Sequence, residues 1–560
     1  MQNEKLRLGI MCRGSTFPAW QALCIQELVR SGLVEIVLII EDDARNDGSA
    51  TLAQKLKRIG VNRALFETYL RTIYRPKSSL PVDLATLLDH VPRRSCVVEK
   101  RGKWSQHFSD DDLQAIRAQK LDLILRFGFN IIRGEILQAA KFGVWSFHHD
   151  DELRYRGGPP CFWEIYHQDP TTGSILQRLT DRLDGGIVLR RGNFRTKAFS
   201  YARNVDQAYF ESAYWPAQVC RDIANRVTDA FAAPPTVTDA PVYRAPTNRQ
   251  FAVACWRMAC AVVGRGWFRL ARLQSWNVAI LRTPIADLIG SDARALRATI
   301  SAMLPVTNRH TFNADSFGIP IDEGFGLLFE ELDASTGGVG RIIAARVGRD
   351  GQEIKRTPAA GIPSRHHTSY PYVWRGGEHV YMLPETGAAG TITLLRATSF
   401  PESWEPVAEL LSGENFIDPT LIRHDGLYWL FYTVHDARYD GDLHLHIAFS
   451  ERLEGPYSRH PANPVKTSAR SARPGGTPFI DRQGRLIRPA QNFCRTYGGS
   501  IVFNRVDLLT PERFSEEEVG ELLPFDPYYK DGLHTIAALD EQHVVVDMKR
   551  HVTRWPWRRR

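Results

Sequence analysis

The 560-residue sequence lacks any apolar run long enough to cross a bilayer. Its most apolar later stretch, FAVACWRMACAVVGRGWFRLARL at 251–273, is interrupted by four arginines, whereas a spanning helix needs about 20 predominantly apolar residues. The opening residues, MQNEKLRLGIMCRGS, are charged at once, and their apolar stretch is too short for a signal peptide. We therefore expect neither a transmembrane nor a secreted protein, and we predict a cytoplasmic location.

The sequence also lacks the patterns that identify disulfide-rich, zinc-binding and dinucleotide-binding proteins. Its eight cysteines form no CxxC pair and follow no regular spacing, which favours a reducing compartment over a disulfide framework. The turn CRGSTF after the first predicted strand holds one glycine and is not a GxGxxG loop. Basic residues are spread along the chain despite a net charge of +8, so we expect no nucleic-acid partner.

Two basic segments depart from this even distribution. The segment 549–560 ends in RWPWRRR and is interpreted as a solvated basic tail, with contact to anionic lipid or phosphate as the alternative. The stretch 251–273 is interpreted as an amphipathic helix that packs between domains, with docking on a membrane surface as the alternative. Together these segments predict at most a weak membrane-surface association.

Short apolar runs alternate with helical patterns over residues 1–230. The predicted strands are 7–11, 34–40, 121–129 and 143–147, and 19–32 is a predicted helix. This alternation is typical of a parallel sheet covered by helices, so we predict an α/β, Rossmann-like domain. Ligands of such sheets bind beyond the carboxyl ends of the strands, where HHDDELRYRGG at 148–158 would lie.

The composition changes after a proline-rich interval at 232–250, and we assign 231–274 to a linker and the amphipathic helix. Beyond it, SYPYVWRGGEHVYMLPET (369–386) and IDPTLIRHDGLYWLFYT (417–433) share a proline start, a charged glycine turn and an aromatic strand. Repeats of short antiparallel strands at intervals of roughly 50 residues are typical of propeller blades. We predict an all-β, five-bladed propeller over 275–548.

The stretch WSFHHDDELRYRGGPPCFWEI at 145–165 combines histidines, acids, an arginine–glycine pair and a proline pair. It follows DLILRFGFNIIRGEIL and precedes Thr172–Gly173 and LDGGIVL. This order resembles the folate-dependent formyltransferases, the family of the methionyl-tRNA and amino-sugar formyltransferases, in which NxHPSLLPxYRGxxPxxWxI occupies the same place. The motifs keep the family's register over residues 121–189.

The resemblance implies transfer of a formyl group from 10-formyltetrahydrofolate to an amine. In its register His148 matches the catalytic histidine, Asp184 matches the catalytic aspartate, and Ser146 stands where the family has asparagine. The reaction needs a donor for the oxyanion and a route for the amine's proton. His148 is expected to polarise the formyl oxygen and take part in proton transfer, with Asp184 orienting it and Ser146 assisting. The residues predicted to bind substrate or cosubstrate are Asn130, His149, Arg156 and Gly157.

The serine is the main departure from the family, since losing one oxyanion donor costs about 100- to 1,000-fold in turnover. The small β-barrel that follows the catalytic domain in the tRNA enzymes has no counterpart here, which favours an amino-sugar or nucleotide-sugar acceptor. No metal site is expected from His148, His149, Asp150 and Asp151, because neighbouring side chains do not easily converge on one ion.

The C-terminal repeats resemble the five-bladed propellers of glycosidases and of the N-terminal domain of glucosamine inositolphosphorylceramide transferases. The resemblance implies a central cleft lined by Asp315, Glu385, Asp418 and Arg473. A glycosidase needs two carboxyl groups flanking the glycosidic bond, and Asp315 and Asp418 match the acidic blade positions, with Glu385 as a candidate acid. Arginine at 473, together with Arg488, His367 and Gln491, would instead suit an anionic sugar or phosphate.

Three functions follow from these observations. The preferred one is a formyltransferase acting on an amino sugar in cell-surface glycan or glycolipid biosynthesis. The first alternative is a glycoside hydrolase or glycosyl-transferring enzyme that uses the propeller and carries a degenerate formyltransferase domain. The second is a non-catalytic carbohydrate-binding protein. The sequence specifies neither the acceptor amine nor the oligomeric state.

Overall fold

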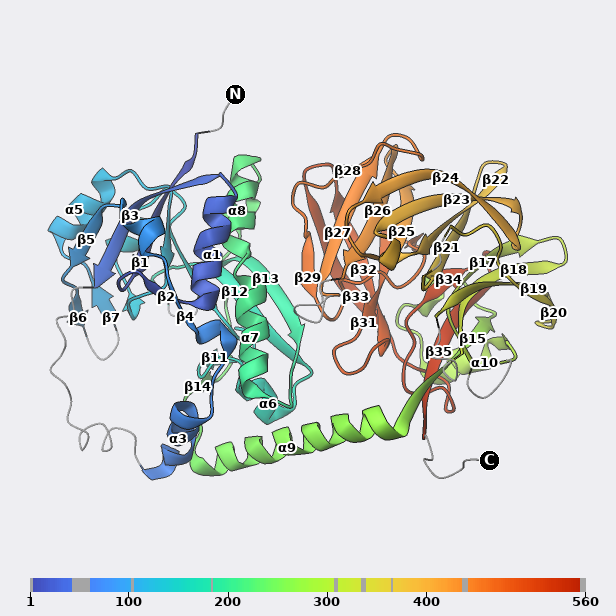
Figure 1. The fold of residues 1–560 in the computed structure, drawn as a ribbon, viewed down its shortest axis with the longest axis horizontal. Coiled ribbons are helices and arrows are strands. Elements are labelled where there is room, and N and C mark those ends of the chain that lie inside the picture. The colour runs from blue at the N-terminus through green and yellow to red at the C-terminus, as the bar shows by residue number, and fades with distance from the viewer. Residues whose placement is uncertain are drawn as a thin grey trace. The chain divides into compact units, whose positions relative to one another are not determined.

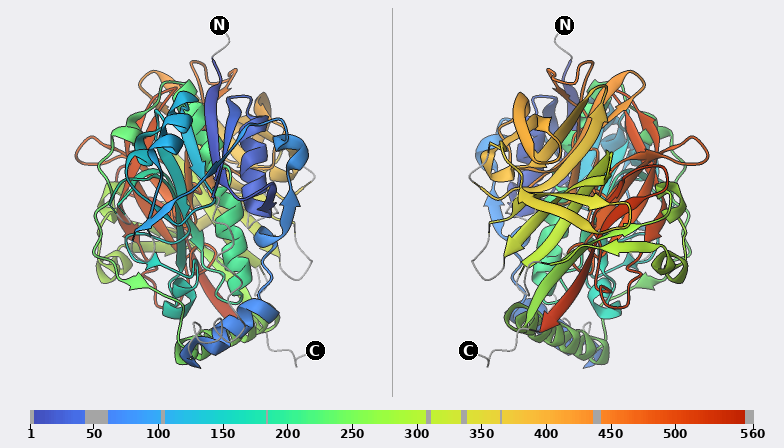
Figure 2. Two further views of the ribbon diagram at one scale, coloured as in Figure 1. Left: turned by 90° about the vertical axis from the view of Figure 1, so that its left-hand side faces the viewer. Right: turned by 90° about the vertical axis from the view of Figure 1, so that its right-hand side faces the viewer.

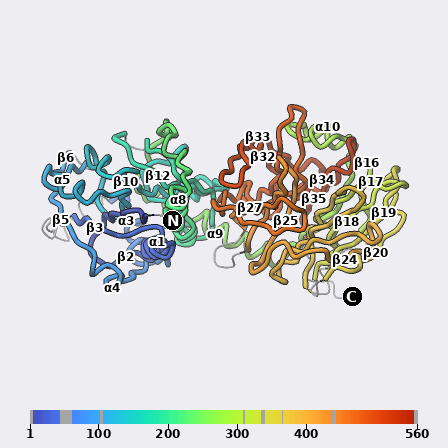
Figure 3. The backbone as a smooth tube through the Cα atoms, turned by 90° about the horizontal axis from the view of Figure 1, so that it is seen from above, coloured from blue at the N-terminus to red at the C-terminus, as the bar shows by residue number. Residues whose placement is uncertain are grey.

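A computed structural model describes residues 4–42, 61–101, 105–182, 185–306, 311–333, 339–363, 366–435 and 442–553. The chain divides into two compact units, unit 1 (Met1–Val263) and unit 2 (Gly264–Arg560). The backbone trace in Figure 3 shows that each unit is formed by one continuous stretch of chain. The two units are described separately below.

A seven-stranded mixed sheet forms the centre of unit 1, in the order β13-β12-β10-β8-β1-β3-β5 (Figure 1). Strands β10, β8, β1, β3 and β5 are mutually parallel, and β12 and β13 extend the sheet in antiparallel fashion. The parallel part agrees with the predicted α/β organisation, whereas the antiparallel pair was not predicted. The strands are β1 (Leu6–Cys12), β3 (Val34–Asp42), β5 (Arg93–Cys96), β8 (Leu123–Arg126), β10 (Val144–His148), β12 (Thr171–Arg178) and β13 (Ile187–Arg195).

Side chains that alternate along each strand separate the two faces of this sheet. Ile124 and Val144 join a core with Leu113 and Ile116 of α5 (Asp110–Ala118), so α5 covers one face. Phe147 contacts Trp20 of α1 (Ala19–Arg30), with ring centroids 5.1 Å apart, on the other face. Helices α7 (Tyr201–Ser212) and α8 (Trp215–Ala224) pack with α1 on that side. Ser146 and His148, in phase with Val144, therefore point to the α5 side.

Smaller elements complete unit 1. Three short sheets pair β2 (Thr16–Pro18) with β4 (Pro81–Asp83), β11 (Arg156–Gly157) with β14 (Val242–Tyr243), and β7 (Ser105–His107) with both β6 (Glu99–Arg101) and β9 (Ile131–Ile132). The remaining helices are α3 (Ala64–Thr72), α4 (Ala85–Leu88), α6 (Trp163–His167) and the long α9 (Asn248–Ala271), which contains the boundary between the units. Among the helices of the described residues, none is both long and apolar enough to cross a membrane.

Unit 2 is built from antiparallel sheets: within its described residues four have four strands, and a fifth, β25-β26-β27-β29, also has the short strand β28 (Ser458–Arg459) paired with β27. One sheet contains both ends of unit 2 and is described below. The second sheet runs from β17 (Thr311–Ile321) to β20 (Glu353–Pro358), and the third from β21 (Ser369–Gly376) to β24 (Ser403–Ser412). The fourth contains β25 (Phe416–His424) to β27 (His444–Ser450) with β29 (Lys466–Ser468), and the fifth runs from β30 (Phe479–Ile480) to β33 (Phe514–Leu522). The strands between these bounds are β18 (Gly324–Asp333), β19 (Arg341–Gly348), β22 (His379–Glu385), β23 (Thr391–Ser399), β26 (Leu427–Val434), β31 (Leu486–Asn492) and β32 (Ser500–Leu509).

The remaining sheet joins the two ends of unit 2. Strand β15 (Arg272–Leu281) pairs along its whole length with β35 (Val544–Thr553), flanked by β16 (Ile300–Met303) and β34 (Ile536–Ala538). The right-hand view of Figure 2 shows β15 and β35 running side by side. Residues 549–553, which the sequence analysis assigned to the basic tail, are thus part of a strand, because Lys549 is buried over the ring of Trp276.

Candidate functional site

Ser146 and Arg126 meet at the carboxyl end of the parallel sheet of unit 1. Arg126 is the last residue of β8, and Ser146 follows the β8–β10 pair Leu125–Trp145. Two guanidinium nitrogens of Arg126, Nη2 and Nε, donate to Ser146 Oγ over 2.7 and 3.2 Å. Arg126 Nη1 donates to the carbonyl oxygens of Phe129 and Asn130 over 3.2 and 2.8 Å.

The guanidinium of Arg126 therefore lies among neutral oxygens. Burial lowers the pKa of Arg126, and within the described parts of unit 1 no carboxylate forms an ion pair with it. A half-buried cation that is held by dipoles alone retains unbalanced positive charge. This end of the sheet is thus electrostatically suited to a negative or developing negative oxygen.

His148 lies on the same face as Ser146, at the end of β10. Its Nε2 is 3.1 Å from the carbonyl oxygen of Tyr155. Because a carbonyl oxygen only accepts hydrogen bonds, Nε2 carries the proton, and Nδ1 is the basic nitrogen of the neutral ring. The ring is therefore oriented by the loop, with one nitrogen able to receive a proton.

The second histidine of the pair belongs to the core. His149 is buried, its Nε2 is 3.1 Å from Ser212 Oγ, and its ring stacks on Phe147. Burial lowers the pKa of His149 well below its usual value, which keeps the ring neutral. The structure does not bring this predicted ligand-binding residue to the site.

The other predicted residues of unit 1 divide into exposed and structural positions. Asn130 is exposed, and its backbone N–H donates to Gln106 Oε1. Arg156 and Gly157 form β11, where the backbone N–H of Arg156 donates to the Pro241 carbonyl oxygen over 3.3 Å. Gly157 has φ +90°, and a Cβ there would lie 2.2 Å from the carbonyl oxygen of Tyr243, so this glycine is required by packing. Asp184 lies outside the described residues.

A buried pair of carboxyl groups, Asp150 and Glu164, supports the loop after β10. Asp150 Oδ1 accepts the backbone N–H of Cys161 over 2.6 Å. Burial raises the pKa of Asp150 well above its usual value and that of Glu164 to about 8. With a pKa of about 8, Glu164 is mostly protonated at neutral pH, and the pair stabilises the loop rather than providing charge to a ligand.

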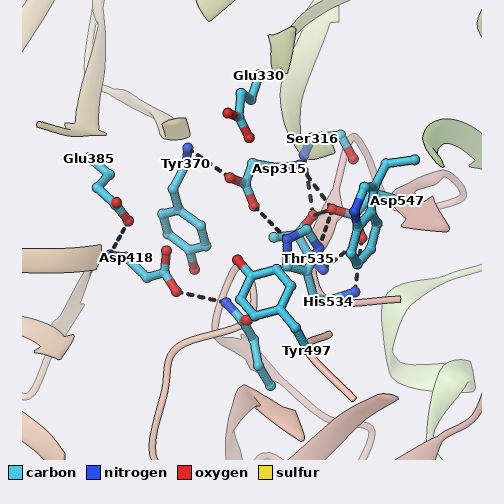
Figure 4. Close-up of polar contacts among 12 residues, drawn as sticks. Asp315, Ser316, Glu330, Tyr370, Glu385, Asp418, Tyr497, His534, Thr535 and Asp547 are labelled. Atoms are coloured by element: carbon cyan, nitrogen blue, oxygen red, sulfur yellow. Dashed lines mark hydrogen bonds and ion pairs between the residues drawn. The ribbon is translucent and has the colours of Figure 1, made fainter. Parts of the chain in front are cut away.

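In unit 2 a histidine bridges two buried aspartates (Figure 4). His534 Nε2 is 3.2 Å from Asp315 Oδ1, and its Nδ1 is 2.6 Å from Asp547 Oδ2. Burial lowers the pKa of His534, but the two carboxylates outweigh burial and raise it overall. Asp315 has its pKa raised to about 6, mainly by burial.

The aspartate of β35 anchors this bridge. Asp547 accepts the backbone N–H groups of Asp315, His534 and Thr535 over 2.9 to 3.0 Å and the Thr535 hydroxyl over 2.7 Å. Ligand atoms of Asp315, His534 and Asp547 lie within 4.8 Å of one another and could hold a metal ion. Because the oxygens of Asp547 already accept these four hydrogen bonds, the geometry fits an imidazolium between carboxylates better than a metal centre.

A second chain of charged groups surrounds Asp418. Arg473 donates from Nε to Asp418 Oδ2 and from Nη1 to Asp442 Oδ2, the latter over 2.8 Å. Glu385 Oε2 accepts the backbone N–H of Asp418 over 3.1 Å, and Gln491 Nε2 donates to Asp418 Oδ2 over 2.7 Å. Burial and then Glu385 raise the pKa of Asp418 to about 7 against the opposing charge of Arg473. Burial also raises the pKa of Glu385.

The structure therefore brings together the four predicted residues of the propeller cleft, but it changes the expected role of the arginines. Arg473 is already balanced by Asp418 and Asp442, and Arg488 pairs with Glu516 over 2.6 Å in the core. Neither is available for the anionic sugar or phosphate that the sequence analysis considered. The cluster has predominantly carboxylate character.

Backbone strain accompanies this cluster. Asp315, Tyr370 and Asp418 have φ values of +52°, +44° and +49°, and each lies where the pairing of the first strand of its sheet shifts register. Such irregularities redirect a side chain at a cost of about 1–3 kcal/mol each, and they concentrate at functional sites. The repetition on β17, β21 and β25 indicates that three sheets present these side chains by the same device.

Comparisons with known proteins match separate parts of the chain. A family model described as glucosamine inositolphosphorylceramide transferase 1, N-terminal, matches residues 298–530. Glucosamine inositolphosphorylceramide transferase 1 of Oryza sativa subsp. indica is 37% identical over 159 residues, 28% of this chain and 21% of that protein. A methionyl-tRNA formyltransferase of Prochlorococcus marinus is 30% identical over 100 residues, 18% of this chain and 30% of that protein.

The chain thus spans about a fifth of the length of the rice transferase and under a third of the length of the formyltransferase. Among solved structures, a family 117 glycoside hydrolase from Zobellia galactanivorans is 14% identical, with a TM-score of 0.32 over 48% of this chain and 80% of that one. Both families named from the sequence are therefore among the similar proteins, each over part of its length.

Several residues of these sites were not predicted. Arg126 interrupts the apolar run LILRFGF, and Asp547 interrupts VVVDMK; an ionised residue inside a buried strand was the available signal. His534, Asp442 and Glu164 gave no such signal, since they follow turns or lie in mixed segments.

Proposed function

We propose that unit 1 transfers the formyl group of 10-formyltetrahydrofolate to the amine of an amino sugar, free or nucleotide-linked, in the assembly of a cell-surface glycan or glycolipid. The partial similarity to a methionyl-tRNA formyltransferase supports the reaction type. The acceptor class is supported by the names of the family model and the rice relative, which contain glucosamine and inositolphosphorylceramide. A cytoplasmic location belongs to the same proposal.

The contact between Arg126 and Ser146 carries this proposal. Arg126 donates two N–H groups to Ser146 Oγ, and the serine hydroxyl donates to the Phe147 carbonyl oxygen over 3.4 Å, an acceptor that the formyl oxygen would replace. A hydroxyl that accepts from a cation is polarised and donates more strongly. The pair is thus a charged substitute for the amide that the family places at this position.

The residues present fit the cosubstrate because the site needs a donor for the formyl oxygen and offers a buried cation that lacks a described carboxylate partner. When bound, 10-formyltetrahydrofolate supplies the one-carbon group. Ser146 and Arg126 would hold the formyl oxygen, and His148 would accept the amine's proton at Nδ1. The Tyr155 carbonyl oxygen keeps His148 in the required tautomer.

The test is incubation of the full chain with 10-formyltetrahydrofolate and a panel of amino sugars, followed by mass spectrometry. We expect one acceptor to gain a formyl group, and His148→Ala to abolish that product. His90→Ala, an exposed histidine of the same unit, is the matched control and should leave the rate unchanged. Absence of both a formylated product and cosubstrate binding would contradict the proposal.

For unit 2 we propose that the five sheets are the blades of a five-bladed propeller. The support is that all five are antiparallel sheets of at least four strands, and that the first and last long strands, β15 and β35, share one sheet. A ring of blades is commonly closed in this way. The strained residues of β17, β21 and β25 would then face a common centre.

A second candidate function, glycosidic-bond chemistry in unit 2, is favoured by Asp418, Glu385 and Asp315. Their pKa values are raised towards neutral pH, and a glycosidase requires one protonated and one ionised carboxyl group. Aryl glycosides test this function: Asp418→Asn should abolish any release of the aryl group, whereas Asp425→Asn, in the exposed turn after β25, should not. Equal rates for the two variants would reject it.

A further inference from the structure

Helix α9 carries a continuous apolar stripe along one side. Trp256, Ala259, Cys260, Val263, Trp267 and Leu270 follow the spacing i, i+3, i+4, i+7, i+11 and i+14. Since an α-helix repeats every 3.6 residues, these six side chains share one face, over a length of about 21 Å at 1.5 Å per residue. In Figure 1 the helix is uninterrupted over this length.

This stripe is exposed. The exposed fractions of Trp256, Val263, Trp267 and Leu270 are 71%, 70%, 61% and 79%, and Ala259 and Cys260 are exposed as well. Two tryptophans and four smaller apolar residues aligned on one open face form a contiguous patch, which differs from apolar residues scattered singly over a surface. A patch of this kind is typical of an interaction surface.

In the first turns of α9 the face opposite the stripe is buried, whereas farther along Arg265 on that side is exposed. Phe251 and Ala254 lie about half a turn away from it and are buried. The ring of Phe251 packs against Phe66 and Tyr69, with centroids 5.4 and 5.1 Å away. The aromatic packing of unit 1 therefore fixes the rotation of α9 about its axis.

The charge of the helix identifies the partner. Residues 248–271 contain Arg249, Arg257, Arg265 and Arg269 and neither aspartate nor glutamate. Tryptophan prefers the headgroup level of a bilayer, and Arg249, which the helical repeat places in line with the stripe, can pair with lipid phosphates while its stem stays in apolar surroundings; Arg265 and Arg269 lie on the far side of the helix. A helix with an apolar, tryptophan-containing face and exclusively basic charge matches the interfacial helices of peripheral membrane proteins.

We propose that α9 lies in the surface of an anionic lipid bilayer, with the stripe from Trp256 to Leu270 inserted at the headgroup–acyl boundary. The helix does not cross the bilayer; it attaches the protein to one leaflet. Its arginines add electrostatic attraction that decreases with ionic strength. This inference is independent of the reaction proposed for unit 1.

The experiment is co-sedimentation of the full chain with phosphatidylcholine vesicles that contain or lack phosphatidylserine. We expect binding to the anionic vesicles, and at least tenfold weaker binding for the double variant Trp256→Ser/Trp267→Ser. Arg249→Gln, at the arginine in line with the stripe, should weaken binding severalfold and reduce its salt dependence. The matched control is Val242→Ser/Ile354→Ser, which removes apolar residues of 54% and 55% exposure outside α9 and should bind as the wild type does.

A second measurement locates the contact without relying on these variants. Cys260 is exposed and lies in the stripe, so an environment-sensitive fluorophore on its thiol should brighten with anionic vesicles. The proposal is overturned if the wild type does not bind anionic vesicles, if the tryptophan variant binds equally well, or if the label does not respond. It is also overturned if sedimentation velocity shows that the stripe variant abolishes a dimer while vesicle binding persists.

Discussion

The two units handle buried charge in opposite ways. At the carboxyl end of the parallel strands of unit 1, the guanidinium of Arg126 is held by a serine hydroxyl and two carbonyl oxygens. In unit 2, acids and bases alternate from Asp547 through His534 to Asp315, and Asp418 and Asp442 flank Arg473. The first arrangement leaves a guanidinium without a described carboxylate partner, whereas in the second each base lies between two carboxylates.

This difference indicates what each set of polar groups contributes. A balanced buried network contributes to stability and to a unique geometry, and breaking one of its pairs exposes an uncompensated charge. An unbalanced buried cation adds little to stability, but it can stabilise negative charge that develops during a reaction. The following changes test this comparison in order of expected effect.

The largest effect is expected from Asp547→Asn, which leaves His534 without its closest counter-charge. Breaking a buried ion pair costs about 3–5 kcal/mol, so the free energy of unfolding of unit 2 should fall by that order. Urea denaturation followed by tryptophan fluorescence measures the change. Asp540→Asn, which removes the surface pair with His543, should cost about 1 kcal/mol or less. Equal losses for the two variants would contradict a balanced network.

Arg126→Met should affect turnover and not folding. We expect formyl transfer to fall about 100- to 1,000-fold, with the Kd of the cosubstrate and the urea midpoint unchanged. Adding Ser146→Asn to this variant should restore part of the rate, because an amide donates without help from a cation. Arg117→Met, in an exposed pair with Glu135, is the control. A lower urea midpoint without loss of kcat would assign Arg126 a purely structural role.

The last prediction concerns pH and the pair Asp150–Glu164. Burial raises the pKa of Glu164 from 4.5 to about 8, so the folded state retains a proton that the unfolded chain releases above pH 4.5. This contribution to stability is complete at low pH and is lost as the pH rises towards about 8. The Tm of unit 1 should therefore decline between these limits, and Glu164→Gln should flatten the decline. Glu135→Gln, at an exposed position, should leave the decline unchanged. Parallel plots of Tm against pH for the wild type and both variants would refute the raised pKa of Glu164.

Much of the fold follows from apolar periodicity. The apolar runs of β1, β3 and β10 and the paired repeats around β21–β22 and β25–β26 were recognisable, since each has a clear strand pattern between turns. Strands β12 and β13 were missed because TTGSILQR and IVLRRGNFR place polar residues throughout. Hydrogen bonding of β12 to β10 and of β13 to β12, and not their own composition, makes these segments strands.

Spacing within 145–165 selected Ser146 and His148, and the structure places both on β10. Proximity that the fold alone creates gave no such signal. The partner of Ser146 comes from a different strand, and Asp547 hydrogen-bonds Asp315 across 232 positions of sequence. No local pattern encodes such a contact, and His149 shows the converse, since a neighbour in sequence points into the core.

The pairing of β15 with β35 also has a consequence for biosynthesis. The aspartate that anchors the His534 bridge lies on β35, the last strand of unit 2, and its partner strand is made first. During translation, unit 1 can fold as soon as its residues leave the ribosome, whereas unit 2 must wait with an open edge until β35 is released. Ribosome-bound chains that stop before Val544 should therefore display exposed strand edges and recruit chaperones, while carrying a completed first unit.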